Sequence, residues 1–392
     1  MKYSVIILAF LYFACVEKKE QDDNPILGKE TITFIIQDLP DQYDFESDIY
    51  ISGNFEGWSG GREQFKLKKT DSILSITLPK YRENISFKFT QGKWGTEECQ
   101  LNGYPIENRT YNFKKVDDTV YVKIANWAND KNQDSPSTAS ENVRVFSEEF
   151  EMPQLHRARR ISIYLPPDYV TSTEHYPVLY MHDGQNVFDA ATSYSGEWKV
   201  DETLNRLHDE EGFGLIVVAI DHGGDKRLNE YAPYDHQKYG RGEGDVYLDF
   251  VANTLKPAID RKYRTNPDKK NTAIMGSSMG GLISHYAVLK HPNTFGKAGI
   301  FSPSFWMAEP IFDLTKTFSS SPDLKLYYLA GGNEGKELVA NVKRMSAILD
   351  GNEFLQANYT LKIVTNGIHS ESFWKEEFED AIKWLFEIEN KS

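Results

Sequence analysis

The chain has 392 residues, of which 40% are hydrophobic and 26% are charged. This length fits two domains, and the composition excludes wholesale disorder, collagen-like repetition and a membrane protein with many spans. The formal net charge of −14 repels phosphate backbones, so we expect no nucleic-acid partner. Aromatic residues make up 13% of the chain, which favours flat surfaces that stack on sugars or line an acyl pocket.

Residues 1–15 predict an export signal. One lysine precedes an apolar run that ends at Ala14 and is shorter than the roughly 20 residues that span a bilayer. Cys15 follows, in an order similar to a bacterial lipoprotein signal, where the cysteine is lipidated; a signal peptide with a chance cysteine is the alternative. Residues 16–29 are polar, as in a solvated tether, and resemble lipoprotein surface-export signals of the Bacteroidetes. We therefore expect a lipid-anchored protein of the outer membrane or cell surface. An anchored protein that faces the periplasm is the alternative.

Residues 30–127 are predicted to form an all-β, immunoglobulin-like sandwich of antiparallel strands. Apolar residues recur with period two in four segments, namely residues 32–36, 73–78, 85–89 and 120–122. Turn sequences such as Gly53-Asn54 and Asn102-Gly103 separate the short segments. Cys99 is expected to be a small buried or half-buried side chain without a disulfide partner.

The pattern of apolar residues along the sequence changes after residue 127 and divides the chain into two parts. Residues 128–142 contain no large apolar side chain and are predicted to be an interdomain linker. In residues 143–392 short apolar strands alternate with amphipathic helices, which predicts an α/β domain with a mostly parallel sheet. The expected strands are residues 178–181, 215–220, 272–275, 297–301, 326–329 and 361–364. The expected helices are residues 245–263, 282–290, 337–349 and 371–387.

A glycine-rich turn between a strand and a helix points most directly to chemistry. The sequence Gly276-Ser277-Ser278-Met279-Gly280 fits the pattern G-x-S-x-G directly after an apolar strand. The flanking glycines permit a strained turn in which the helix passes close to the strand. Ser278 is therefore the predicted nucleophile.

A serine nucleophile needs a general base, and in this arrangement the serine, the acid and the histidine follow in that chain order. His285 and His291 fall within or at the end of the next helix, where structural or capping roles are expected. His369 lies in a loop after the last strand and is the predicted base. Glu334, in a glycine-rich loop after the preceding strand, is the predicted acid, while Glu337 is expected in the following helix.

Ester hydrolysis also requires N–H donors for the developing oxyanion. The N–H of Met279, at a helix N-terminus, is one candidate. The other is the loop after residues 178–181, where Gly184 can turn its own N–H or that of Gln185 inward; an ordinary strand-to-loop turn is the alternative. His182 and Asp183 lack a second set of ligands, so we expect no metal and no cofactor.

Four segments carry a resemblance to a known family: YLPPDY at 164–169, YPVLYMHDG at 176–184, GSSMGG at 276–281 and GIH at 367–369. With them, residues 159–391 resemble the esterase branch of the α/β-hydrolases. That branch holds S-formylglutathione hydrolases, feruloyl and acetylxylan esterases, siderophore trilactone esterases and mycolyltransferases.

The resemblance implies an α/β-hydrolase fold in which Ser278 is the nucleophile, His369 is the base and the Gly184-Gln185 backbone completes the oxyanion hole. Some siderophore-esterase relatives use a serine and a histidine alone, which leaves the role of Glu334 open. The resemblance also places three residues where the substrate cleft is lined, although structural roles remain the alternative: Trp306, Arg227 and Glu230.

The N-terminal half resembles a second family. GNFEGW at 53–58, SFKF at 86–89 and GKW at 92–94 are similar to the glycogen-binding domain of the AMP-activated kinase β subunit and to starch-binding modules. The resemblance implies that Trp58, Trp94 and Lys88 hold an α-glucan, with Asn108 as a candidate amide. Strand alternation separately predicts that Lys88 points outward. A spacer sandwich whose tryptophans only pack is the alternative.

These features predict an exported serine esterase that forms an acyl-enzyme, needs no cofactor, and acts on acylated or feruloylated carbohydrate. The alternatives are a siderophore trilactone esterase and a surface glycan-binding lipoprotein with an inactive hydrolase domain.

Overall fold

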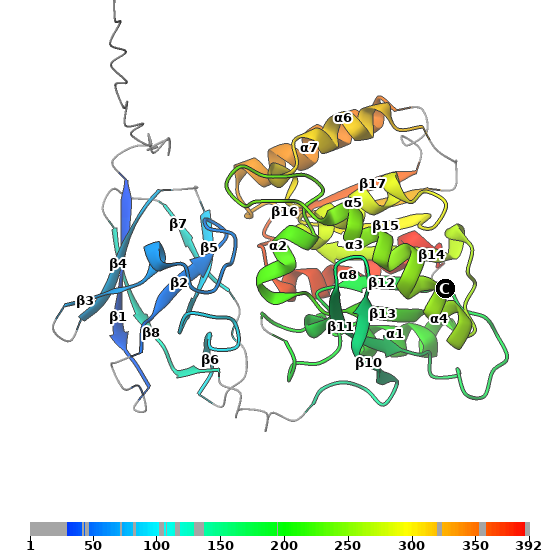
Figure 1. The fold of residues 1–392 in the computed structure, drawn as a ribbon, viewed down its shortest axis with the longest axis horizontal. Helices are drawn as coiled ribbons and strands as arrows, with labels where there is room; N and C mark the ends of the chain where they lie inside the picture. The colour runs from blue at the N-terminus through cyan, green and yellow to red at the C-terminus, as the bar shows by residue number, and fades with distance from the viewer. Residues whose placement is uncertain are drawn as a thin grey trace, which may run out of the picture.

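The computed structural model describes residues 30–40, 43, 47–70, 73–80, 84–101, 106, 108–113, 118–128, 137–193, 195–319, 324–352 and 358–388. Cys15 and the expected signal and tether lie outside the described residues, as do residues 129–136 of the expected linker. The helices in these ranges are all too short or too polar to cross a membrane. A β-sandwich and an α/β body lie side by side (Figure 1).

Two sheets and a short ribbon form the sandwich. One sheet has the order β3-β4-β1-β8, with β1 (Thr31–Asp38), β3 (Lys68–Thr70), β4 (Ile73–Pro79) and β8 (Asp118–Lys123). The other has the order β2-β5-β7, with β2 (Tyr50–Gly53), β5 (Asn84–Thr90) and β7 (Arg109–Asn112), and β6 (Glu98–Cys99) pairs with β9 (Asn126–Trp127). All of these pairs are antiparallel except that β1 runs parallel to β8, so the purely antiparallel prediction is wrong for that pair.

Alternate residues of these strands build the sandwich core. Phe34 of β1 packs against Phe87 of β5 with ring centroids 4.7 Å apart. Cys99 is buried, as expected, and burial raises the pKa of its thiol to about 11.

Lys88 does not point outward, contrary to the prediction. It is fully buried on β5, near Glu97 of the segment that leads into β6. The N–H of Phe89 donates to Glu98 Oε1 at 3.0 Å, and Thr90 forms an antiparallel β-bridge with Glu97. Burial raises the pKa of Glu97, and the nearby Lys88 ammonium opposes that rise. Lys88 is therefore buried on the face of β5 opposite Phe87 and Phe89, which face the core.

The α/β body contains an eight-stranded sheet of order β10-β11-β13-β12-β14-β15-β16-β17. At one end of the sheet, β10 (Val143–Met152) and β11 (Arg157–Tyr164) run antiparallel to their neighbours and were not predicted. The six parallel strands correspond to the six predicted ones: β12 (Val178–His182), β13 (Ile216–Ile220), β14 (Thr272–Ser277), β15 (Lys297–Phe301), β16 (Lys325–Gly331) and β17 (Tyr359–Val364).

Helices cover both faces of this sheet (Figure 1). Leu179 and Met181 share one core with α1 (Val200–Glu211) and α8 (Glu371–Phe386). Val178 and Tyr180 share the other, because successive side chains of a strand point to opposite faces. The helices on that second face are α3 (Gly244–Phe250), α4 (Lys256–Lys262), α5 (Met279–Lys290), α6 (Pro310–Thr317) and α7 (Lys336–Asp350). A π-helical turn over Val251–Leu255 joins α3 to α4, so the predicted helix over 245–263 is present, whereas α1 and α6 were not predicted.

The described end of the linker is bound to the α/β body. Thr138 Oγ1 donates to Glu197 Oε1 at 2.9 Å, and the N–H of Ser140 donates to Asp201 Oδ2 at 2.7 Å. Residues 137–142 therefore follow the surface of the second body before β10 begins.

Candidate active site

Ser278 sits at the turn between β14 and α5 with φ +57° and ψ −118°. This backbone conformation is rare for a residue with a side chain and is stabilised by close packing of the turn. The N–H of Ser278 donates to Phe301 O at 2.9 Å, and a Cβ on Gly276 would lie 2.9 Å from the backbone carbon of Gly280. The predicted strand, turn and helix are therefore present, with the serine at the carboxyl end of the sheet.

His369 and Glu334 meet as the sequence predicted. His369 Nδ1 lies 2.7 Å from Glu334 Oε2. The other oxygen, Glu334 Oε1, accepts from the hydroxyl of Ser302 and the N–H of Gly331, each at 2.6 Å. The carboxylate is completely buried and has donors at both oxygens, which is the arrangement that orients an imidazole as a base.

Trp374 contacts both His369 and the serine that donates to Glu334. Its Nε1 donates to Ser302 Oγ at 2.8 Å, and its ring lies edge-on to His369 with centroids 4.9 Å apart. Ser302 has φ +46°, which turns its hydroxyl between Trp374 and Glu334. Sequence reasoning missed the role of Trp374, for which the only signal was an aromatic residue in the first turn after the His369 loop.

The candidate oxyanion loop is tied to the end of β13. A Cβ on Gly184 would lie 2.6 Å from Asp221 Oδ1, so only glycine fits there without a shift. The side chain of Gln185 accepts from the N–H of His222 at 3.0 Å and donates to its carbonyl at 3.3 Å. Met279 is the first residue of α5, where N–H groups have no partner inside the helix. These positions agree with the proposed donors, whose role stays a prediction.

Arg227 and Asp183 fix the start of that loop. Asp183 has φ +57°, and its two oxygens accept from Arg227 Nε at 2.6 Å and Nη2 at 2.8 Å. Burial alone would lower the pKa of Arg227, but Asp183 raises it well above its usual value. In turn, Arg227 holds the pKa of Asp183 below its usual range despite burial. Both groups therefore stay charged beside Ser278.

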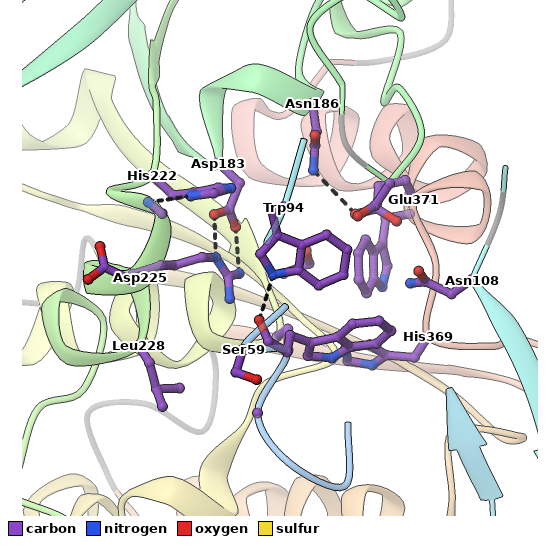
Figure 2. A pocket seen from close by; sticks show the side chains of 18 of the residues that line it. Ser59, Trp94, Asn108, Asp183, Asn186, His222, Asp225, Leu228, His369 and Glu371 are labelled. Carbon is purple, nitrogen blue, oxygen red and sulfur yellow. Dashed lines mark hydrogen bonds and ion pairs between the residues drawn. The ribbon is translucent and has the colours of Figure 1, made fainter. Parts of the chain in front are cut away.

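Both bodies line one cleft of about 200 Å³ around Ser278 and His369 (Figure 2). The sandwich contributes Trp58, Trp94 and Asn108, three of the four residues predicted to hold a glycan. The α/β body contributes loop residues that include Asp183, Asn186, His222, Arg227 and Glu371. The predicted carbohydrate-binding tryptophans and the predicted nucleophile thus share one cavity.

The tryptophan pair has a defined geometry. The ring centroids of Trp58 and Trp94 lie 6.0 Å apart with 42° between the planes. Trp94 Nε1 donates to Trp58 O at 2.7 Å, and Trp58 has φ +56°. The cleft continues past Trp58 into a second cavity that Trp306 and Leu338 line.

The remaining predicted residues divide into two groups. Trp306 and Arg227 line the cleft, as expected. Glu230 does not belong there: its side chain is completely buried and pairs with Arg157 and Arg159, so the prediction for this residue is wrong. His285 is buried between Tyr328 and Thr315, in the structural role expected for it.

A sequence profile of the family described as "Putative esterase" matches residues 153–385. The chain belongs to this family. It is a carboxylic ester hydrolase with an α/β-hydrolase fold.

Curated relatives of this esterase match parts of the chain. "Uncharacterized protein YbbA" of Bacillus subtilis is 26% identical over 59% of this chain and 94% of its own. An "Endo-1,4-beta-xylanase/feruloyl esterase" of Xylanibacter ruminicola is 28% identical over 39% of this chain, which spans 20% of that protein. A "Siderophore triacetylfusarinine C esterase" of Aspergillus fumigatus is 28% identical over 33% of this chain and 44% of its own.

Among solved structures, an enterochelin esterase from Shigella flexneri has a TM-score of 0.54 at 15% identity. The similarity covers 92% of this chain and 94% of that one, so it includes the sandwich as well as the α/β body. An IroE-like serine hydrolase from Shewanella oneidensis has a TM-score of 0.50 at 20% identity over 62% of this chain and 79% of its own. At these identities the similarity shows a shared fold.

Proposed function

We propose that this protein is a serine esterase with the triad Ser278, His369 and Glu334. Ser278 Oγ attacks the ester carbonyl while His369 Nε2 takes its proton, and Glu334 holds the imidazole through Nδ1. The alcohol leaves with the proton from His369, and water then releases the acid from the acyl-enzyme by the same base. The N–H of Met279 and that of Gly184 or Gln185 would stabilise the oxyanion.

The proposed substrate is an acylated or feruloylated carbohydrate. The observation that carries this proposal is the pair Trp58 and Trp94 in the same cavity as Ser278 and His369. Flat indole surfaces stack on sugar rings or on an aromatic acyl group, and the 42° between them suits a curved ligand. We infer that the sandwich holds part of the ester substrate at the cleft, in preference to an α-glucan bound elsewhere.

The same proposal includes export of the protein and its anchoring by a lipid on Cys15, since polymeric carbohydrate is found outside the cell. Incorporation of labelled palmitate that persists in Cys15→Ser would contradict it.

The catalytic part is tested by hydrolysis of p-nitrophenyl acetate and methyl ferulate by protein that begins at residue 25. Ser278→Ala should lower kcat by at least about 10⁴-fold, and Glu334→Gln by about 10² to 10⁴-fold. Glu337→Gln is the matched control, because it makes the same change at a nearby carboxylate in the first turn of α7, and should stay within about twofold. Full activity of Glu334→Gln would reduce the triad to a Ser278–His369 pair.

The substrate part is tested with a feruloylated arabinoxylan oligosaccharide. Trp58→Ala and Trp94→Ala should each raise its KM by about 5 to 150-fold, because a stacked ring contributes about 1 to 3 kcal/mol. Hydrolysis of p-nitrophenyl acetate should change less than about threefold. Tyr121→Ala removes an exposed aromatic of the other sheet and serves as control.

Three results would redirect the substrate proposal while leaving the triad intact. Equal loss on both esters would mean that the tryptophans only support the fold. Faster turnover of a catecholate trilactone than of the feruloyl ester would favour the siderophore alternative. Retardation of the protein by amylopectin that Trp58→Ala abolishes, without an effect on KM, would favour separate glucan binding. A wild type without turnover or fluorophosphonate labelling would instead favour the glycan-binding lipoprotein.

A further inference from the structure

Three carboxylates gather next to the cleft, where the linker meets α1. Glu197 lies in the loop before α1, and Asp201 and Glu202 lie in its first turn. One oxygen from each residue falls within a set whose members are all within 4.8 Å of one another. Asp201 is completely buried and Glu197 nearly so, which makes this a group of charges largely withdrawn from water.

The hydrogen bonds of the cluster leave two oxygens without a donor. Asp201 Oδ2 accepts from the N–H of Ser140, and Glu197 Oε1 accepts from Thr138. Within the described residues, Asp201 Oδ1 and Glu202 Oε2 are buried and accept no hydrogen bond. The unsatisfied oxygens thus belong to two adjacent members of the cluster, and one of them is on the completely buried side chain.

Nearby positive charge does not offset this arrangement. Lys199 Nζ is 3.4 Å from the other oxygen of Glu202 and is half exposed. The N-terminus of α1 supplies the equivalent of about half a positive charge, against three carboxylates. Buried carboxylates require a counter-charge or a proton, because the cost of burying an unpaired charge is several kcal/mol.

We propose that Glu197, Asp201 and Glu202 bind a divalent cation of the calcium class. Ca²⁺ takes oxygen ligands in flexible geometry and completes its coordination with water, which suits three carboxylates at the edge of a helix. The partial exposure of Glu202 leaves a route for the ion to enter.

The bound cation would stabilise two segments at once. Through Glu197 and Asp201 it would hold residues 138–140 of the linker against the α/β body. It would also fix the loop that precedes α1, in which the N–H of Trp198 donates to the carbonyl of Asn186 at 2.8 Å. Asn186 lines the cleft, and the Trp198 ring packs against Trp374 with centroids 5.8 Å apart.

The test uses the full-length folded protein, freed of cations with EDTA and returned to metal-free buffer at pH 7.5. Thermal unfolding is followed with increasing CaCl₂, with NaCl of equal ionic strength as reference, and bound calcium per chain is counted by plasma mass spectrometry. The Tm should rise by about 5 to 10 °C when Ca²⁺ exceeds its Kd 100-fold, with one calcium bound per chain.

Glu197→Gln and Glu202→Gln should abolish both the Tm rise and the bound calcium. Glu210→Gln makes the same change on an exposed residue of α1 and should retain them. A wild type without calcium or a Tm shift would overturn the proposal and assign the two oxygens to a shared proton. Retention of the shift in both cluster variants would place the ion elsewhere and overturn it equally. The wild-type measurement decides the question even where a variant fails to fold.

Discussion

Buried ionisable groups surround the candidate oxyanion loop, and one of them makes stability depend on pH. Asp221 lies next to Gly184. Its Oδ1 is buried and, in the described structure, accepts no hydrogen bond. Burial raises the pKa of Asp221 to about 6, although Arg160 opposes the rise. The folded state therefore binds this proton more tightly than the unfolded chain does, so the contribution of Asp221 to stability is most favourable below pH 4 and is lost as the pH rises through 6.

Asp221→Asn should remove this penalty. An amide of the same shape does not ionise, so at pH 7.5 the variant should be more stable than wild type by up to about 3 kcal/mol, for a shift of roughly two pKa units. The difference should vanish near pH 4. Urea unfolding between pH 4 and 8 measures it, with the exposed Asp225→Asn as control. Parallel pH profiles for Asp221→Asn and wild type would show that Asp221 ionises normally.

At the scale of elements, α5 packs so closely against the backbones of β14 and β15 that a side chain is excluded at the contact. A Cβ on Gly281 would lie 2.6 Å from Phe301 O, the same carbonyl that accepts from the N–H of Ser278. A clash with backbone cannot be relieved by rotation of a side chain, so the turn itself must move.

Gly281→Ala should therefore destabilise the protein by about 1 to 3 kcal/mol and lower kcat on both small and large esters. Gly351→Ala, at the end of α7, adds the same methyl group where its nearest neighbour is 3.6 Å away and φ is negative. That control should change stability by less than about 1 kcal/mol. Unfolding in urea and hydrolysis of p-nitrophenyl acetate measure the two effects, and equal behaviour of both variants would contradict the argument.

Local signals explain which elements could be predicted. The parallel strands inside the sheet are apolar runs buried on both faces, whereas β17 at the edge is only partly buried, and the turn at Ser278 is defined by its own glycines. Glu334 was located by its loop and the expected chain order. In contrast, the environment of Lys88 includes Glu97, nine residues later, and that of Glu230 depends on Arg157 and Arg159, more than 70 residues earlier. Periodicity carries no information about such distant partners.

At the scale of the whole molecule, the cleft belongs to two bodies that the sequence separates by a linker. Two motifs, one in each half, were predicted to serve different ligands, yet Trp58 and His369 line the same cavity. The bodies meet through sparse contacts: Asn84 Nδ2 donates to Asn333 O at 3.2 Å, and the Arg62 guanidinium lies 5.6 Å from the centre of the Tyr239 ring. Because Asn333 precedes Glu334, the first contact also reaches the triad loop.

These contacts should determine how firmly the sandwich closes the cleft. The double variant Arg62→Ala/Asn84→Ala removes an exposed hydrogen bond and a cation–π contact between the bodies, each contributing about 0.5 to 1 kcal/mol. It also removes the 3.6 Å ion pair of Arg62 with Glu56 and a side chain that lines the cleft. We expect the KM for a feruloylated oligosaccharide to rise about 3 to 20-fold, since the tryptophans would face Ser278 for less of the time. The kcat for p-nitrophenyl acetate should stay within about twofold, because the triad lies wholly in the α/β body.

Lys68→Ala, on the exposed edge strand β3, makes a comparable truncation away from the α/β body and should leave both substrates unaffected. Steady-state kinetics on the two esters with all three proteins separates the possible outcomes. A loss confined to the large ester means that the sandwich acts as a wall of the cleft, so its position relative to Ser278 is part of substrate recognition. An unchanged KM for the oligosaccharide would mean that the α/β body alone binds the substrate, because loosening the contact would then remove nothing that the ester touches.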